Sequence, residues 1–131
     1  MSEPDLKKRT KAFALRVLKL VGVLPKTTAG RTLAAQIVRF GTSVAANYRS
    51  ACRAKSTADF IAKMGIVEEE ADETLFWLEL LEESALVSSA KLTAIKQEAN
   101  ELIAITIASI KTARRNRTPN SEFRIPHSEL A

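Results

Sequence analysis

Apolar side chains recur at steps of three and four residues in four separate segments of the chain. Successive residues of an α-helix are about 100° apart, so positions with this spacing share one face. The pattern predicts amphipathic helices over about residues 5–24, 28–53, 57–83 and 89–115. No stretch alternates between apolar and polar residues as a half-buried strand does, and no internal repeat is present.

The segments are separated by recognisable end signals. Pro25 stops the first helix, and Ser56 followed by Asp59 resembles a capping box at the start of the third. Four helices with short connections predict an all-α, up-down antiparallel four-helix bundle over residues 1–115. Residues 116–131 contain Pro119 and Pro126, and we expect them to form a flexible C-terminal tail.

Composition excludes several classes of site. The chain has 131 residues, enough for one domain, and 46% of them are hydrophobic. One Cys and one His exclude a disulfide framework and a Cys/His zinc site. No Ser-His-Asp set, di-iron motif or phosphate loop is present. Residues 12–24 are too short and too charged to span a membrane. We therefore expect a cytoplasmic protein that is not an enzyme, with no catalytic residues, metal or cofactor.

Charge is unevenly distributed along the chain, whose net charge is +5. Residues 1–63 hold thirteen Lys and Arg against three acidic residues, whereas residues 64–110 hold two Lys against ten acidic residues. Arginine binds phosphate well because its guanidinium makes two parallel hydrogen bonds. The predicted nucleic-acid-binding residues lie on the second helix and just after it: Arg31, Arg39, Arg49, Arg53 and Lys55. The alternative, a solvated face that pairs with acidic residues of the third helix, stays open.

Two positions within the helices have more than one interpretation. Gly41 lies in the middle of the second helix, where it either permits close packing or weakens the helix. In the third helix, Phe76, Trp77 and Leu80 point roughly opposite to the core stripe, so another chain is expected to cover them in an oligomer interface. The alternative is that the tail or a loop folds over this patch.

A less favoured interpretation is a magnesium-dependent nucleotide pyrophosphohydrolase. Glu70 and Glu73 on the third helix and Glu98 and Glu101 on the fourth have the spacing of paired carboxylate ligands. Both Glu73 and Glu101 lie far from the core stripes of their helices, which argues against one common cage.

The segment from Leu33 to Glu83 resembles the bacterial protein family named for an intervening sequence of 23S ribosomal RNA genes. The resemblance rests on Gln36, Arg39 and the Ser43-Val44-x-x-Asn47 signature, followed by Asp59-Phe60-Ile61 and the acidic run from Glu70 to Leu81. One departure is Tyr48-Arg49-Ser50-Ala51, where many members have Ile-Ala-Glu-Gly. The resemblance implies a four-helix bundle that assembles as a ring, typically a homopentamer.

The family is also similar to the accessory variability protein of diversity-generating retroelements, which works with a reverse transcriptase and nucleic acid. The expected function is therefore a non-catalytic homo-oligomer that binds structured RNA or DNA without strong sequence preference. The alternative is an oligomeric scaffold or adaptor for a protein partner such as a reverse transcriptase.

Overall fold

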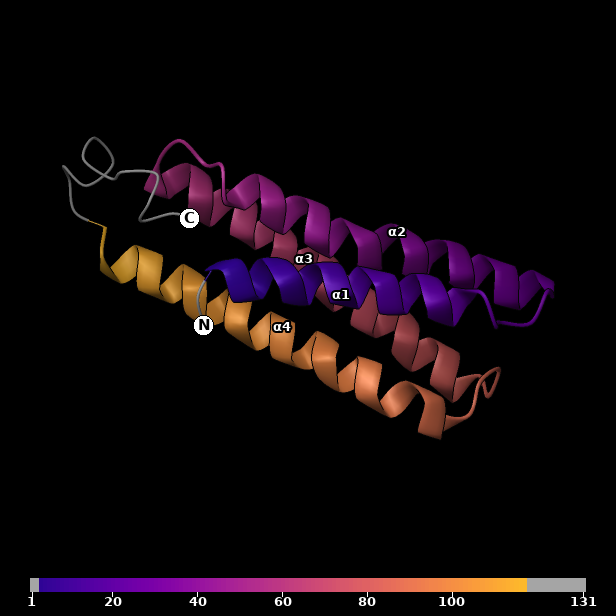
Figure 1. The fold of residues 1–131 in the computed structure, drawn as a ribbon. Helices are drawn as coiled ribbons and strands as arrows, with labels where there is room; N and C mark the ends of the chain where they lie inside the picture. Colours follow the sequence, from indigo (N-terminus) through magenta and orange to yellow (C-terminus); the bar gives the residue numbers. More distant parts are fainter. Residues whose placement is uncertain (1–2, 118–131) are drawn as a thin grey trace.

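The computed structural model describes residues 3–117, and these form four α-helices and no strand. The helices are α1 (Glu3–Val21), α2 (Thr28–Ala51), α3 (Thr57–Glu83) and α4 (Ser89–Arg115). They run alternately up and down in one bundle, as predicted (Figure 1). The expected tail lies outside the described residues from position 118 onward.

Two helices are shorter than the periodicity predicts. Helix α1 ends at Val21 rather than Leu24, and α2 ends at Ala51 rather than Arg53. After Val21 the chain turns through Gly22 and Val23, and Leu24 comes back into the core although it is no longer helical. Leu24 continues the three- and four-residue spacing of the buried residues although it lies in a turn. The spacing therefore predicts a longer α1 than the structure has.

The turn before α2 depends on a close backbone approach. The side chain of Thr27 caps α2 by accepting a hydrogen bond from the backbone N–H of Gly30 at 3.1 Å. A Cβ atom at Gly30 would lie 2.0 Å from the carbonyl oxygen of Pro25. Only glycine fits at this position, so Gly30 permits the tight turn through which the chain enters α2.

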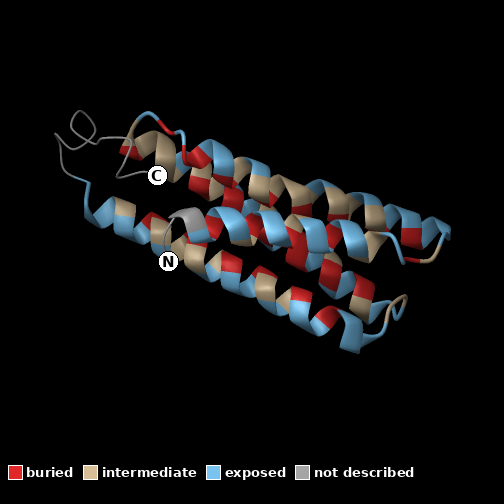
Figure 2. Ribbon diagram, in the orientation of Figure 1, coloured by how far each residue is buried: buried red, intermediate tan, exposed pale blue. Residues whose placement is uncertain are grey.

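The core is a continuous apolar cluster to which every helix contributes one stripe (Figure 2). Its largest fully buried side chains include Phe13 of α1, Ile37 of α2, Met64 of α3 and Leu102 of α4. Burying a side chain of this size contributes roughly 1.5–3 kcal/mol. Asn47, a polar residue on the stripe of α2, is partly buried, and its Nδ2 donates to the carbonyl oxygen and Oγ of Ser43.

The four helices are not packed equally. Helix α2 packs closely on both α1 and α3, and α3 also packs on α4, whereas α1 and α4 touch much less. A three-residue ion cluster bridges this loose seam: the guanidinium of Arg9 binds Glu98 through Nε–Oε2 at 3.0 Å and Nη2–Oε1 at 2.6 Å, and Glu101 at 2.9 Å. Hydrogen bonds from the guanidinium to these two carboxylates raise the pKa of Arg9 above its ordinary value.

Candidate nucleic-acid interface

The five predicted phosphate-binding residues are exposed but do not form one patch. Arg31 precedes Arg49 by eighteen residues on α2, a separation of about 27 Å at 1.5 Å per residue. Arg39 lies in the middle of the helix, with its guanidinium carbon 5.3 Å from the centroid of the Phe40 ring. Only Arg49, Arg53 and Lys55 lie close together, at the end of α2 and in the turn that follows.

The up-down topology brings these three residues to the most basic part of the molecule. At one end of the bundle, α1 and α3 begin and α2 and α4 end (Figure 1). We call this the basic end, because it carries twelve lysines and arginines against five acidic residues, whereas the other described residues hold seven basic and eight acidic side chains. Its acidic residues are Glu3, Asp5, Asp59 and the two carboxylates that bind Arg9, Glu98 and Glu101. Its basic residues are Lys7, Lys8, Arg9, Lys11, Arg49, Arg53, Lys55, Lys63, Lys111, Arg114, Arg115 and Arg117.

The turn between α2 and α3 is held firmly beneath its exposed cations. Ala51, Cys52 and Ala54 are buried, so the backbone on either side of Arg53 is anchored in the core. The next turn is closed by hydrogen bonds: the backbone N–H of Lys55 donates to Asp59 Oδ2 at 3.1 Å. The N-cap Ser56 accepts from the backbone N–H of Asp59 at 3.0 Å.

The carboxylate of Asp59, in the first turn of α3, already accepts two hydrogen bonds. Hydrogen bonds from the Lys55 backbone N–H and from the Lys63 ammonium lower the pKa of Asp59 below its ordinary value of 3.8. By contrast, the structure gives no ion pair to Arg49, Arg53 or the Lys55 ammonium within residues 3–117. The arrangement leaves three exposed cations on an anchored backbone, which suits the binding of phosphate.

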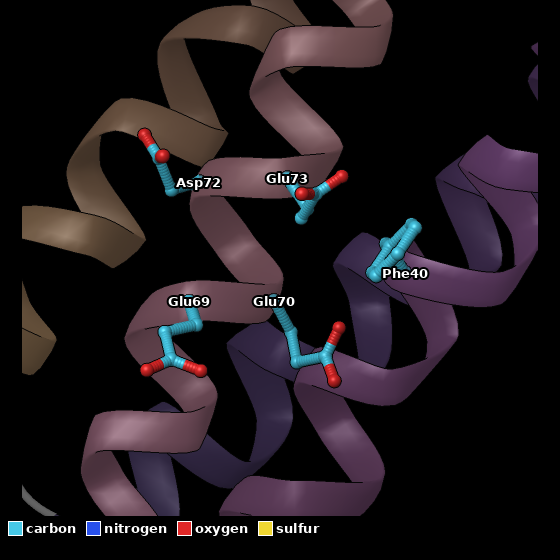
Figure 3. Close-up of a pocket in the computed structure, with 5 residues that line it drawn as sticks. All are labelled: Phe40, Glu69, Glu70, Asp72 and Glu73. Carbon is cyan, nitrogen blue, oxygen red and sulfur yellow. The ribbon is translucent and has the colours of Figure 1, made fainter.

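The acidic residues of α3 lie elsewhere. Phe40 of α2 and four acidic residues of α3 line an open hollow of about 400 Å³. Figure 3 shows Glu70 and Glu73 nearer to Phe40, whereas the side chains of Glu69 and Asp72 extend away from it. No ion pair joins these acids to the predicted basic residues of α2 within the described part of the chain. Within the described residues, the basic face of α2 therefore does not pair with the acidic residues of α3.

The four carboxylates of the pyrophosphohydrolase interpretation do not converge. Glu70 and Glu73 lie beside α2, whereas Glu98 and Glu101 bind Arg9 of α1. Between residues 3 and 117 there is no group of three His, Cys, Asp or Glu side chains that could hold a metal ion. One pair of carboxylates is therefore held by Arg9 of α1, and the other pair faces α2.

The aromatic patch of α3 differs in one residue from the prediction. Phe76 and Leu80 are exposed, as the periodicity predicts. Trp77 is instead half-buried and packs on the core. Its Nε1 donates to Glu73 Oε2 at 2.9 Å. The rings of Phe76 and Trp77 meet edge to face, with centroids 5.0 Å apart.

A second exposed apolar pair was not predicted. Leu15 and Leu18 of α1 are 60% and 47% exposed. Both lie off the core stripe on the lysine-rich face of the helix. The sequence indicates this pair only by two leucines three residues apart among lysines. That signal is weak, because single exposed leucines are common on protein surfaces.

Together, the fold and the site define an all-α four-helix bundle with one strongly basic end. Comparison with known proteins identifies the group more closely. The chain belongs to the 23S rRNA-intervening sequence protein family, whose model matches residues 3–108.

Among solved structures, the chain is similar to a protein of unknown function from the S23 ribosomal protein family of Bacteroides thetaiotaomicron VPI-5482. The two are 35% identical with a TM-score of 0.79, over 85% of this chain and 99% of the other. No curated protein matches the chain. Within the described residues, no helix is both long and apolar enough to cross a bilayer.

Proposed function

We propose that this protein is a non-catalytic homo-oligomer that binds the phosphate backbone of structured RNA or duplex DNA through its basic end. The supporting observation is a group of three exposed cations at the end of α2 and in the anchored turn, which form no ion pair within residues 3–117: Arg49, Arg53 and Lys55. They are flanked at the same end by further basic residues of α1 and α4. Phosphate contacts carry little sequence information, so binding would tolerate different sequences.

Assembly would strengthen weak contacts. A single basic end makes few phosphate contacts, but a ring of copies, as the family resemblance suggests, would offer several at once. The exposed Phe76 and Leu80 supply an apolar surface for such assembly, with Trp77 packed behind them. The only aromatic ring exposed within residues 3–117 is thus on α3, away from the basic end, and base stacking has no part in the proposed mode of binding.

The test is a fluorescence-anisotropy titration of a labelled RNA hairpin and a labelled DNA duplex, at about 50 and about 200 mM salt. We expect affinity to fall steeply with salt for the unmodified chain. Arg49→Glu/Arg53→Glu should weaken binding and reduce the slope of log K against log salt by about 0.9 for each lost duplex phosphate contact.

The matched control is Lys26→Glu/Lys91→Glu, which makes the same change of net charge at two exposed lysines far from the basic end. It should retain most of the binding. Equal loss in both double variants would mean that only net charge matters and would contradict a localised site. No binding by the unmodified chain at the lower salt would refute phosphate recognition and favour a protein partner.

A further inference from the structure

In the described part of the chain, the large exposed apolar side chains lie on only two helices and the turn after one of them. Within residues 3–117, the large hydrophobic residues that remain exposed are Leu15 and Leu18 on α1, Val23 just after it, and Ile66, Phe76 and Leu80 on α3. Helices α2 and α4 have none. Since α2 and α4 are the neighbours that flank α3, and α1 packs mainly on α2, helices α1 and α3 lie diagonally across the bundle.

Each of these two helices carries one outward stripe with heptad-like spacing. On α1 the stripe is Lys8, Lys11, Leu15 and Leu18, and all four side chains are exposed. On α3 it is Glu69, Glu73, Phe76 and Leu80, which are also all exposed. Steps of three and four residues keep each set on one ridge of its helix, as in the contact seam of a coiled coil.

The two stripes match in chemistry, order and length. Along the chain direction, each presents two charged residues and then two apolar residues, with lysines on α1 and glutamates on α3. At 1.5 Å per residue, Lys8 to Leu18 spans about 15 Å and Glu69 to Leu80 about 16 Å. A parallel alignment places Lys8 and Lys11 opposite Glu69 and Glu73, and the leucines of α1 opposite Phe76 and Leu80. An antiparallel alignment would place the lysines against the apolar residues.

The charged residues of both stripes are available for such a contact. The structure gives no ion pair to Lys8, Lys11 or Glu69 within the described residues. Glu73 accepts a hydrogen bond from Trp77, whose ring meets that of Phe76 edge to face. A carboxylate still has acceptor sites for a lysine after one such bond.

From this match we propose that the α1 stripe of one copy docks in parallel onto the α3 stripe of the next copy. The proposal rests on the oligomeric state in the proposed function and names its two surfaces. Because the stripes lie on opposite sides of the bundle, the contact is heterologous, and repetition gives either a closed ring or an open chain. Because α1 and α3 run in the same direction, neighbouring copies would be aligned, with every basic end on one rim.

The experiment measures the mass of the full chain in solution by native mass spectrometry and sedimentation velocity. The unmodified chain should assemble into multiples of its 14.4 kDa protomer. Lys8→Glu/Lys11→Glu and Glu69→Lys/Glu73→Lys should each weaken association by about 30-fold or more, which is the loss expected at hot-spot positions. Leu15→Asp/Leu18→Asp should do the same by removing the apolar half.

The decisive variant combines both charge reversals in one chain. In the fourfold variant the lysines and glutamates have exchanged places, so assembly should return. Lys26→Glu/Lys91→Glu, outside both stripes, should keep the mass of the unmodified chain. Helical circular dichroism of every variant checks that each one folds.

The outcomes separate the two proposals. If the unmodified chain assembles but the reversals leave its mass unchanged, or the fourfold variant fails to recover, the α1–α3 contact is refuted while oligomerisation stands. If the unmodified chain is monomeric, oligomerisation fails together with the contact, and phosphate binding is judged separately by the anisotropy titration.

Discussion

The crossing of α1 and α2 leads to a prediction in which one substitution has opposite effects at two sites. A Cβ atom at Gly41 would lie 2.7 and 2.9 Å from the two γ-methyl carbons of Val17, whereas a Cβ at Gly65 of α3 would have nothing within 4 Å. Ordinary carbon–carbon contacts are about 3.5–4.0 Å. Gly41→Ala therefore drives a methyl group into a filled space, while Gly65→Ala adds one to open surface.

The magnitudes follow from these distances. Replacing glycine by alanine in a helix interior gains about 1 kcal/mol of stability, and Gly65→Ala should show most of this gain. At Gly41 the same gain is offset by overpacking, which costs about 1–3 kcal/mol. We expect the upper part of that range, because Val17 is fully buried and a β-branched side chain has one strongly preferred rotamer in a helix. Gly41→Ala should therefore destabilise the fold by about 1–2 kcal/mol.

The assay is urea unfolding at one fixed protein concentration, since assembly makes apparent stability depend on concentration. Val17→Ala in the Gly41→Ala background is the matched test, because it removes the two methyl carbons that clash. The double variant should be more stable than the sum of the two single effects, by about 1–2 kcal/mol. The packing argument would be wrong if Gly41→Ala were as stable as Gly65→Ala, or if the two single effects were additive.

Three further predictions concern the ion pairs and the turns. Arg9→Met should lower stability by about 1 kcal/mol or less, since the cluster is partly exposed, and the loss should shrink in urea titrations at about 1 M salt. The pKa of Asp59 is lowered by folding, so its contribution is present above pH 3.8 and is lost as the pH falls through the folded-state pKa. The difference in urea midpoint between the unmodified chain and Asp59→Asn should therefore narrow from pH 7 to about pH 3, and a constant difference would contradict this. Ala85 has a φ of 60° after the end of α3, so Ala85→Gly should raise the thermal midpoint, by an amount equivalent to about 1 kcal/mol. A lower midpoint would show that this backbone conformation is not strained.

The sequence predicts the helices well because their signals are local. Periodicity and end signals such as Ser56 act within one or two turns, so they need no knowledge of the partner helix. The start of α3 shows this, since Ser56 accepts the hydrogen bond from Asp59 that a capping box requires. The predicted end of α1 is wrong because tertiary packing, and not a local signal, buries Leu24. This residue keeps the helical spacing although it lies in a turn.

Features of the candidate site that depend on distance in space were harder to predict. Arg9 meets Glu98 across 89 positions of sequence, and no local pattern indicates that pairing. Arg31 and Arg49 share a face of α2, yet helix length alone keeps them far apart. The outward position of Phe76 and Leu80 follows from periodicity, but that of Leu15 and Leu18 becomes informative only when the structure shows that α2 and α4 have no such residues.

Basic residues gather at one end of the bundle and acidic residues along α3. This separation of charge connects the proposed phosphate binding with the proposed assembly. In a single bundle, the basic end and the acidic outer face of α3 are separate surfaces, and each proposal concerns one of them. Parallel docking would neutralise Lys8 and Lys11 against the acidic stripe of α3, and would leave Arg49, Arg53 and Lys55 of every copy exposed on one rim. Antiparallel or isologous docking would instead distribute the basic ends over opposite sides of the assembly. The direction of α1 on α3 therefore determines whether a continuous phosphate backbone could contact several copies at once, because only aligned copies present their cations on the same face.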